Sequence, residues 1–313
     1  MKDKALPPAG GAKRRAGGNR RTVAILIIQI LNSIFYAAIL FLIAAGLSLI
    51  YGVMRIVNMA HGTFYALGAY VTAWAVGKAT GGASFEFLFL LLPIGAVAVA
   101  ATGLVIEPIL FRPLYNRPEE YILLLTFGLL LILEDVMRYL FGGTPLTAGV
   151  LIDGLGNFPV FNHRYPVYNL LVIGVGAASA LALWAFIYRT KFGVILRATS
   201  QNRRMAQALG LDVRRVYMLA FALGCFISGL GGAIVVPAQA AVLGMGVDAL
   251  ILAFVVVVIG GLGSLEGALI GSLLVGFVRT AGIQFFPEIE LAVLYLIAAG
   301  VLLVRPTGLF GKA

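Results

Sequence analysis

From residue 27 onward the chain consists of continuously apolar segments, most of them long enough to cross a lipid bilayer. A helix needs about 20 apolar residues to span the hydrocarbon core. Only helices and closed barrels satisfy their backbone hydrogen bonds in lipid, and barrel strands alternate rather than run continuously apolar. Charged residues make up 12% of the chain, against roughly a quarter in a soluble domain. The sequence therefore predicts an all-α integral membrane protein.

The chain divides into an N-terminal tail and one membrane domain that contains all of the apolar segments. Residues 1–26 begin with a stretch rich in Pro, Gly, Ala and Lys/Arg, so we expect a basic, disordered cytoplasmic tail. Residues 27–313 are expected to form a polytopic transmembrane domain. Its apolar segments lie at residues 27–51, 59–77, 85–110, 119–142, 168–188, 216–236, 249–262, 268–285 and 290–304.

Two basic clusters set the expected orientation of these segments. Residues 2–21 and residues 189–215 each hold seven Lys or Arg. Basic flanks of apolar spans stay in the cytoplasm, so we expect both clusters and the C-terminus on that side. Five segments lie between the clusters, and an odd number of crossings would separate them. Segment 59–77, which follows the break at 52–58, is therefore predicted to be re-entrant or broken, beside about eight membrane-spanning helices.

The placement of charge also bears on partners and on chemistry. Both basic clusters flank apolar segments, which favours contact with membrane lipid and argues against nucleic acid. The sequence has no Walker A, GxSxG or HExxH motif, so we expect no catalytic residues and no enzyme activity. We expect Glu134 and Arg138 to pair on one helix face, and Glu107 and Arg279 to lie at the membrane interface. The sequence shows no series of buried acids, which weakens an ion-coupled mechanism.

Residues 58–62 form a polar start to an apolar segment. Asn58 is a favoured N-cap residue. A half-helix that begins at membrane depth directs its positive end into the protein, where it suits a carboxylate. We therefore interpret Asn58, His61 and Gly62 as bordering a substrate path; a plain cap on a packing helix is the alternative. A metal site is not expected, because His163 is the only other histidine and no acid is near in sequence.

A stripe of small residues follows Gly260. Gly263, Gly267 and Gly271 recur every four residues, which places them on one helix face and allows another helix to approach closely. A dinucleotide-binding loop is the alternative interpretation. The glycine spacing does not match it, and no strand–turn–helix context surrounds it.

The basic segment 189–215 contains a candidate docking helix. Met205 and Leu209, like Ala206 and Gly210, are four residues apart and share a helix face. A short helix here would present small and apolar side chains among cations such as Arg204 to a cytoplasmic partner. A solvated loop that only sets the topology is the alternative.

Three stretches together resemble the permeases of branched-chain amino acid ABC transporters. The first is GLSLIYGVMRIVNMAHG at residues 46–62, continuing to Tyr65; the others are residues 197–210 and 260–271. The resemblance covers about residues 27–311. It adds Tyr65 to the substrate-path residues and identifies Arg204, Met205, Ala206, Leu209 and Gly210 with the family's ATPase-coupling loop. Where the wider ABC-importer pattern opens this loop with an acid, the chain has Arg204.

The resemblance implies a multisubunit importer in a bacterial inner membrane. Its expected partners are a second related permease, two cytoplasmic ATPases and an extracytoplasmic solute-binding protein. ATP would be bound by the ATPases, and no cofactor by this chain. The expected substrates are branched-chain or related hydrophobic amino acids. Permeases for urea and short-chain amides share these signatures and remain an alternative, as does an ion-coupled secondary transporter.

Overall fold

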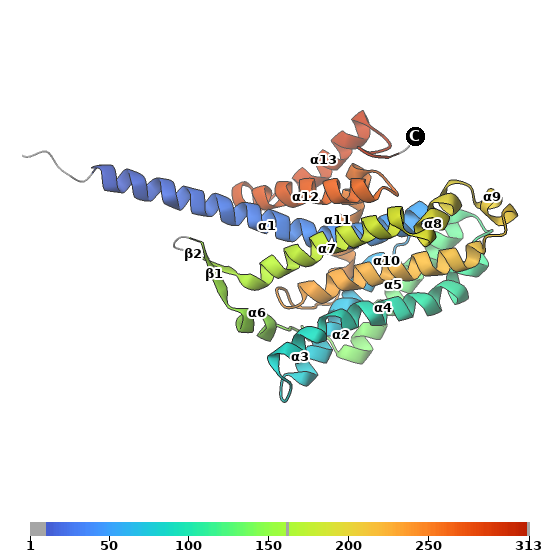
Figure 1. Ribbon diagram of the computed structural model, residues 1–313, viewed down its shortest axis with the longest axis horizontal. Helices are drawn as coiled ribbons and strands as arrows, with labels where there is room; N and C mark the ends of the chain where they lie inside the picture. The colour runs from blue at the N-terminus through green and yellow to red at the C-terminus, as the bar shows by residue number, and fades with distance from the viewer. Residues whose placement is uncertain (1–10, 161–162, 312–313) are drawn as a thin grey trace, which may run out of the picture.

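A computed structural model describes residues 11–160 and 163–311, with side chains from residue 23 onward (Figure 1). The helices are α1 (Gly11–Met54), α2 (His61–Ala79), α3 (Phe85–Leu90), α4 (Leu92–Ile106), α5 (Glu119–Phe141), α6 (Val150–Leu155), α7 (Val167–Arg189), α8 (Lys191–Gln201), α9 (Arg203–Ala208), α10 (Val213–Val235), α11 (Met245–Gly260), α12 (Leu265–Phe285) and α13 (Glu290–Val304). A π-helical turn η1 (Glu107–Phe111) and a 3-10 turn η2 (Arg112–Leu114) extend α4, and strands β1 (Asn157–Val160) and β2 (His163–Pro166) form a short antiparallel hairpin.

The predicted all-α membrane fold is confirmed. Within the described residues, five helical stretches are long and apolar enough to cross a membrane: Val23–Met54, Phe85–Leu114, Val167–Arg189, Val213–Val235 and Leu265–Phe285. Helices α11 and α13 are shorter apolar helices of 16 and 15 residues. Helices α2 and α5 add 19 and 23 residues.

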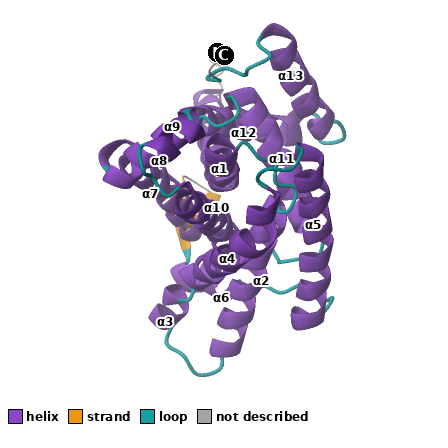
Figure 2. Cartoon of the chain, turned by 90° about the vertical axis from the view of Figure 1, so that its right-hand side faces the viewer, coloured by secondary structure: helices purple, strands orange, loops and turns teal. Residues whose placement is uncertain are grey.

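Helices α1 and α10 lie near the middle of the bundle, with α7, α12, α11 and α4 around them (Figure 2). Small residues allow these helices to pack closely. A Cβ at Gly176 of α7 would lie 2.6 Å from the Ala38 side chain, and one at Gly276 of α12 would lie 2.7 Å from the Ser33 carbonyl oxygen. Residues 39–50 of α1 are almost wholly buried as a result.

The predicted break after α1 is present. The chain leaves helix at Met54, and among the described residues Arg55 is the one non-glycine residue with a positive φ, +54°. The chain then turns back into the bundle. The ring of His61, the first residue of α2, contacts the carbonyl oxygen of Ile43, about 16 Å back along α1 from Met54.

Segment 59–77 is broken but not re-entrant. Helix α1 ends beside α8, whereas α2 is followed by α3, which packs against α6 and lies at the opposite end of the bundle (Figure 1). The segment between Met54 and Phe85 therefore runs from one end to the other. Counting crossings from helical segments alone missed this, because a non-helical stretch, residues 55–60, completes the distance that α2 alone leaves.

Among the described residues, the start of α1 and the basic segment 189–215 lie at opposite ends of the bundle, whereas we expected both basic clusters on one side. Helix α1 starts at the left of Figure 1 and ends at the right, where α8 and α9 lie. Residues 1–10 of the predicted disordered tail fall outside the described residues, and residues 11–26 form the first turns of α1. The last described residues lie at the α8–α9 end, where Phe310 N donates to the Gly260 oxygen. We call this the basic end.

Candidate functional site

Asn58 stabilises the break between α1 and α2 rather than capping α2. Its Oδ1 accepts a hydrogen bond at 3.0 Å from the backbone N of Ala60, two residues later in the chain. This contact forms an Asx-turn. The helix cap is Ala60, because α2 starts at His61 and not at residue 59 as predicted. Asn58 is fully buried, and its Nδ2 has no hydrogen-bond partner among the described residues.

His61 and Gly62 lie where the N-terminal ends of α2 and α11 meet. The Nε2 atom of His61 is 3.0 Å from the Ile43 oxygen, and the side chain is fully buried. A Cβ on Gly62 would lie 1.9 Å from the carbonyl oxygen of Gly246 in α11. Both residues are thus packed between helices, while Tyr65, one turn further along α2, lines a cavity.

This cavity, which we call the distal cavity, lies away from the basic end and has a volume of about 370 Å³. Its walls come from α1, α2, α11, α12, α13 and the segment that joins α10 to α11. The polar side chains that line it are Tyr36, Tyr65, Gln239, Asp248, Arg279 and Tyr295, and the aliphatic ones include Ile39, Leu40, Ile43, Val235 and Leu252.

Arg279, expected at the membrane interface, lines this cavity and contacts two other helices. Its Nη1 donates a hydrogen bond to Tyr36 Oη, and its guanidinium carbon lies 4.5 Å from the centre of the Tyr36 ring. Its Nη2 is 3.7 Å from Glu290 Oε1, so α12 is joined to both α1 and α13. This cluster could not be predicted from local sequence patterns, because Tyr36 and Arg279 are 243 residues apart.

A larger cavity of about 960 Å³, the proximal cavity, lies at the basic end. It is lined by α1, α7, α8, the turn before α12 and the last described residues, and its polar groups include Tyr188, Arg197 and Glu266. The two cavities lie on opposite faces of α1, since a helix turns about 100° per residue. The distal cavity takes Tyr36, Ile39, Leu40 and Ile43, and the proximal cavity takes Ala45, Ser48, Leu49 and Gly52.

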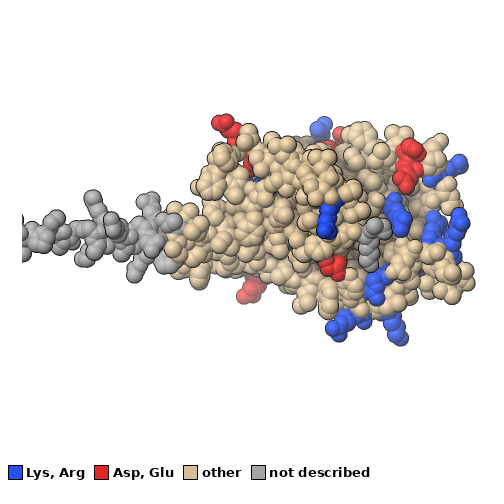
Figure 3. Space-filling model, turned by 90° about the horizontal axis from the view of Figure 1, so that it is seen from above, with Lys and Arg blue, Asp and Glu red and all other residues tan. Residues whose placement is uncertain are grey.

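Helix α9 projects from the basic end as a capped six-residue helix. Asn202 Oδ1 accepts a hydrogen bond from Met205 N at 3.0 Å, and Gly210, with φ +81°, ends the turn in the left-handed conformation that glycine favours. Met205 and Leu209 are 58% and 73% exposed, whereas Ala206 is buried against the bundle. Arg204 and Gly210 are also exposed. Figure 3 shows Lys and Arg side chains gathered at this end of the molecule.

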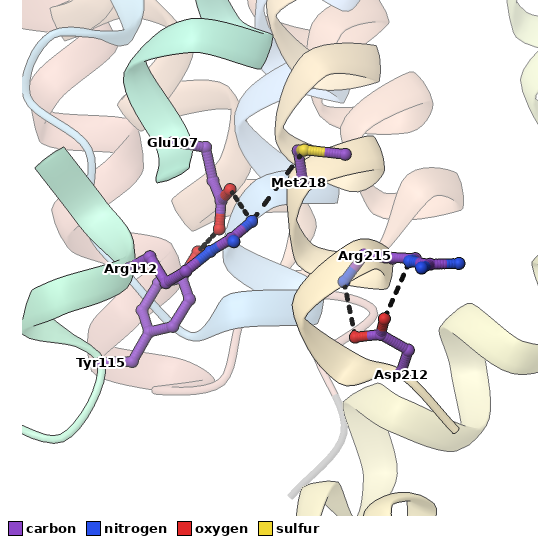
Figure 4. A network of polar contacts seen from close by, with 6 residues as sticks. All are labelled: Glu107, Arg112, Tyr115, Asp212, Arg215 and Met218. Atoms are coloured by element: carbon purple, nitrogen blue, oxygen red, sulfur yellow. Dashed lines mark hydrogen bonds and ion pairs between the residues drawn. The ribbon is translucent and has the colours of Figure 1, made fainter. Parts of the chain in front are cut away.

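A polar cluster lies beneath α9 and joins it to the membrane helices (Figure 4). The guanidinium of Arg203 lies 5.8 and 5.6 Å from the ring centres of Tyr115 and Tyr217. Tyr115 Oη in turn donates to Glu107 Oε1, and Arg112 Nη2 donates to Glu107 Oε2 at 3.1 Å. Glu107, expected at the interface, is fully buried and begins the π-helical turn η1.

The surroundings of Tyr115 keep its hydroxyl protonated. Burial and the hydrogen bond to the Glu107 carboxylate raise the pKa of Tyr115, so its hydroxyl remains a donor. Close by, Asp212 caps α10 by accepting from Arg215 N at 3.2 Å, and its Oδ2 lies 2.9 Å from Arg215 Nε (Figure 4).

The predicted Glu134–Arg138 pair is replaced by another contact. Arg138 Nη1 lies 3.9 Å from Asp135 Oδ1, and both of these side chains are exposed. Glu134, the residue before Asp135, lies on the side of α5 that approaches Gly244. Its carboxylate therefore does not contact Arg138. An exposed pair of this kind contributes about 0–1 kcal/mol to stability.

Gly267 and Gly271 lie on one face of α12, whereas Gly263 lies in the turn before this helix with φ +79°, which corrects the expectation that all three share a helix face. A Cβ on Gly267 or Gly271 would lie 2.3 Å from the Gly260 oxygen or 2.5 Å from the Val256 oxygen, both of α11. A Cβ on Gly263 would lie 3.0 Å from Gly52 Cα of α1. The stripe therefore sets the distance between α12 and α11, the helices that carry Arg279 and Asp248.

Comparison with known proteins gives the family. Residues 29–304 match the family described as "Branched-chain amino acid transport system / permease component". The high-affinity branched-chain amino acid transport system permease protein LivH of Salmonella typhimurium is 28% identical over 91% of this chain and 95% of its own length. The corresponding protein BraD of Pseudomonas aeruginosa is 27% identical with the same coverage. The ribose import permease protein RbsC of Escherichia coli is 24% identical over 71% of this chain and 68% of its own length.

Proposed function

The chain belongs to the branched-chain amino acid transport permease family, and we propose that it is the membrane-spanning subunit of an ABC importer for branched-chain or related hydrophobic amino acids. It is a multi-pass membrane protein, and we place it in a bacterial inner membrane. The observation that most supports an ATP-driven mechanism is the exposure of Met205 in the capped helix α9, and of Leu209 directly after it, at the basic end.

Two cytoplasmic ATPase subunits would dock on α9. An exposed apolar pair surrounded by cations is typical of a surface that a protein partner covers. This chain would bind no ATP itself; ATP binding and hydrolysis would take place in the partners. With the basic end in the cytoplasm, the C-terminus is cytoplasmic and the start of α1 lies on the opposite side. A second related permease would complete the membrane part, and a solute-binding protein would deliver substrate at the distal end.

The cluster under α9 supplies a route for coupling. A movement of α9 would reach Tyr115 and Tyr217 through Arg203, and through Glu107 it would reach the end of α4. ATP binding can drive import only if the ATPases bind two permease conformations with unequal affinity. The region that differs between the two conformations would include η1, which contains Glu107. Such π-helical turns are often found at functional sites.

Affinity purification from the native membrane, followed by mass spectrometry and reconstitution, tests the proposal. We expect two ATPase subunits and a second permease to copurify, and ATP-dependent uptake of leucine when the binding protein is added. Uptake of urea or acetamide in preference to leucine would overturn the substrate assignment. A chain that purifies alone and whose uptake collapses with an ionophore would overturn the ATP-driven mechanism.

A further inference from the structure

The distal cavity combines charges of both signs with an aliphatic wall. Arg279 of α12 and Asp248 in the first turn of α11 both line it, and Ile39, Leu40 and Leu252 face the same space. Ionisable residues are costly at membrane depth and mark functional sites there. A cavity of about 370 Å³ also has the size of a small-molecule site.

The guanidinium of Arg279 has hydrogen-bonding capacity that the protein leaves unused. A guanidinium carries five N–H donors in a planar fork that matches a carboxylate. One donor bonds to Tyr36 Oη, and the contact to Glu290 is 3.7 Å, longer than a hydrogen bond. Arg279 Nε and Glu290 Oε2 are both buried without a partner among the described residues. Unsatisfied buried groups of this kind are costly, and a bound carboxylate would satisfy the guanidinium.

Asp248 supplies the opposite charge. Its carboxylate forms no hydrogen bond or ion pair with any other residue that the structure describes. It lies in the first turn of α11, at the helix end that carries partial positive charge. Asp248 therefore presents free acceptor oxygens to the cavity that Arg279 also lines.

We propose that the distal cavity binds the zwitterion of an aliphatic α-amino acid. Arg279 takes the carboxylate through paired hydrogen bonds, Asp248 takes the ammonium group, and the aliphatic wall takes the side chain. The cavity lies away from α9, on the side where a binding protein would release its ligand. This assignment rests on the proposed function for its substrate class, and it adds the residues that recognise the substrate within the membrane.

Photolabelling of the purified transporter tests this site. The complete complex is incubated with a diazirine analogue of L-leucine and irradiated, and the labelled peptides are identified by mass spectrometry. The variants are Arg279→Gln and Asp248→Asn. Arg138→Gln is the matched control, because Arg138 is an exposed arginine of α5 outside the cavity. Asp248→Asn preserves shape and removes no contact within the protein, so its result is informative even if Arg279→Gln lowers the yield.

We expect label in peptides that contain residues 36–43 or 248–252, with roughly a tenfold or greater loss in both variants and none in the control. Excess L-leucine should compete, whereas leucinamide and 4-methylpentanoate, which each lack one charge, should not. Wild-type labelling in both variants, or label confined to the proximal cavity, would overturn the assignment. ATP-dependent leucine uptake by the same preparation separates the two proposals: intact uptake with unchanged labelling refutes this site alone, and absent uptake in the wild type refutes the importer.

Discussion

The molecule contains two clusters of the same three residue types, one at each end. At the basic end, Glu107 has both carboxylate oxygens bonded, to Arg112 at 3.1 Å and to Tyr115. At the distal cavity, Glu290 lies 3.7 Å from Arg279 and leaves one oxygen without a partner. Each arginine leaves its Nε without a partner among the described residues, so the clusters differ in the carboxylate and in their surroundings. Glu107 is bonded within the protein (the closed cluster), whereas Tyr36 and Arg279 of the second cluster line a cavity (the open cluster).

The difference shows that an intramembrane Arg–Glu pair has no fixed role. A buried carboxylate whose two oxygens both accept hydrogen bonds within the protein holds the elements that carry its donors together. A pair that stays apart beside a cavity keeps donors available, at a cost in stability. We therefore assign the closed cluster to mechanical linkage and the open cluster to recognition, and the following variants test that division.

Gly210→Arg should have the largest effect on transport. A residue other than glycine is strained at φ +81°, and the added bulk would occupy the exposed surface where an ATPase docks. We expect uptake to be abolished while membrane insertion and leucine photolabelling stay at wild-type levels. Uptake assays and labelling of the same membranes check this. Normal uptake would remove α9 from the coupling mechanism.

Glu107→Ala should cost far more stability than Glu290→Gln. Removing Glu107 leaves Arg112 and the Tyr115 hydroxyl without their partner, which we expect to cost roughly 2–4 kcal/mol, discounted because Arg112 is one-third exposed. Glu290→Gln loses only a loose contact and should cost about 1 kcal/mol or less. Thermal unfolding of the purified complex measures both. Equal losses would mean that the two clusters do not differ as the contacts indicate.

Gly267→Ala tests whether close helix packing positions the open cluster. The new methyl group would lie 2.3 Å from the Gly260 oxygen and would push α12, which carries Arg279, away from α11, which carries Asp248. We expect a loss of about 1–3 kcal/mol in stability and weaker photolabelling. Gly128→Ala in α5 is the control, because nothing lies within 4 Å of that site. It should be neutral or stabilising by up to about 1 kcal/mol, the gain in helix propensity.

The sequence predicts the helices well, because apolar length and helix breaks are local properties. The predicted segment 290–304 coincides with α13, and the break predicted at 52–58 overlaps residues 55–60, which separate α1 from α2. The short exposed helix α9 was predicted from spacing and charge around Met205. Element type was thus recoverable wherever one stretch of chain carried the information.

Long-range contacts were not recoverable in this way. Arg279 meets Tyr36 across the bundle, and no periodicity relates residues so far apart. The direction of α1 relative to the basic segment 189–215 was missed because charge counting treats each apolar segment as either crossing the membrane or not crossing it. Residues 55–60 cross part of the bundle without being helical. Glu107 was misplaced because its partners Arg112 and Tyr115 face it only through the π-helical and 3-10 turns.

Arg203→Gln should produce the smallest effect, and it tests linkage apart from stability. The substitution removes the cationic face-on contacts to Tyr115 and Tyr217, each worth about 0.5–1 kcal/mol at a partly exposed site, and leaves the Glu107 cluster intact. We expect a two- to fivefold fall in leucine imported per ATP hydrolysed, with a normal melting temperature and normal copurification of ATPases. Arg138→Gln, which touches neither cluster, should leave that ratio unchanged. If the ratio is also unchanged in Arg203→Gln, the closed cluster stabilises the fold without transmitting motion from α9, and the division between linkage and recognition would hold only for the distal cavity.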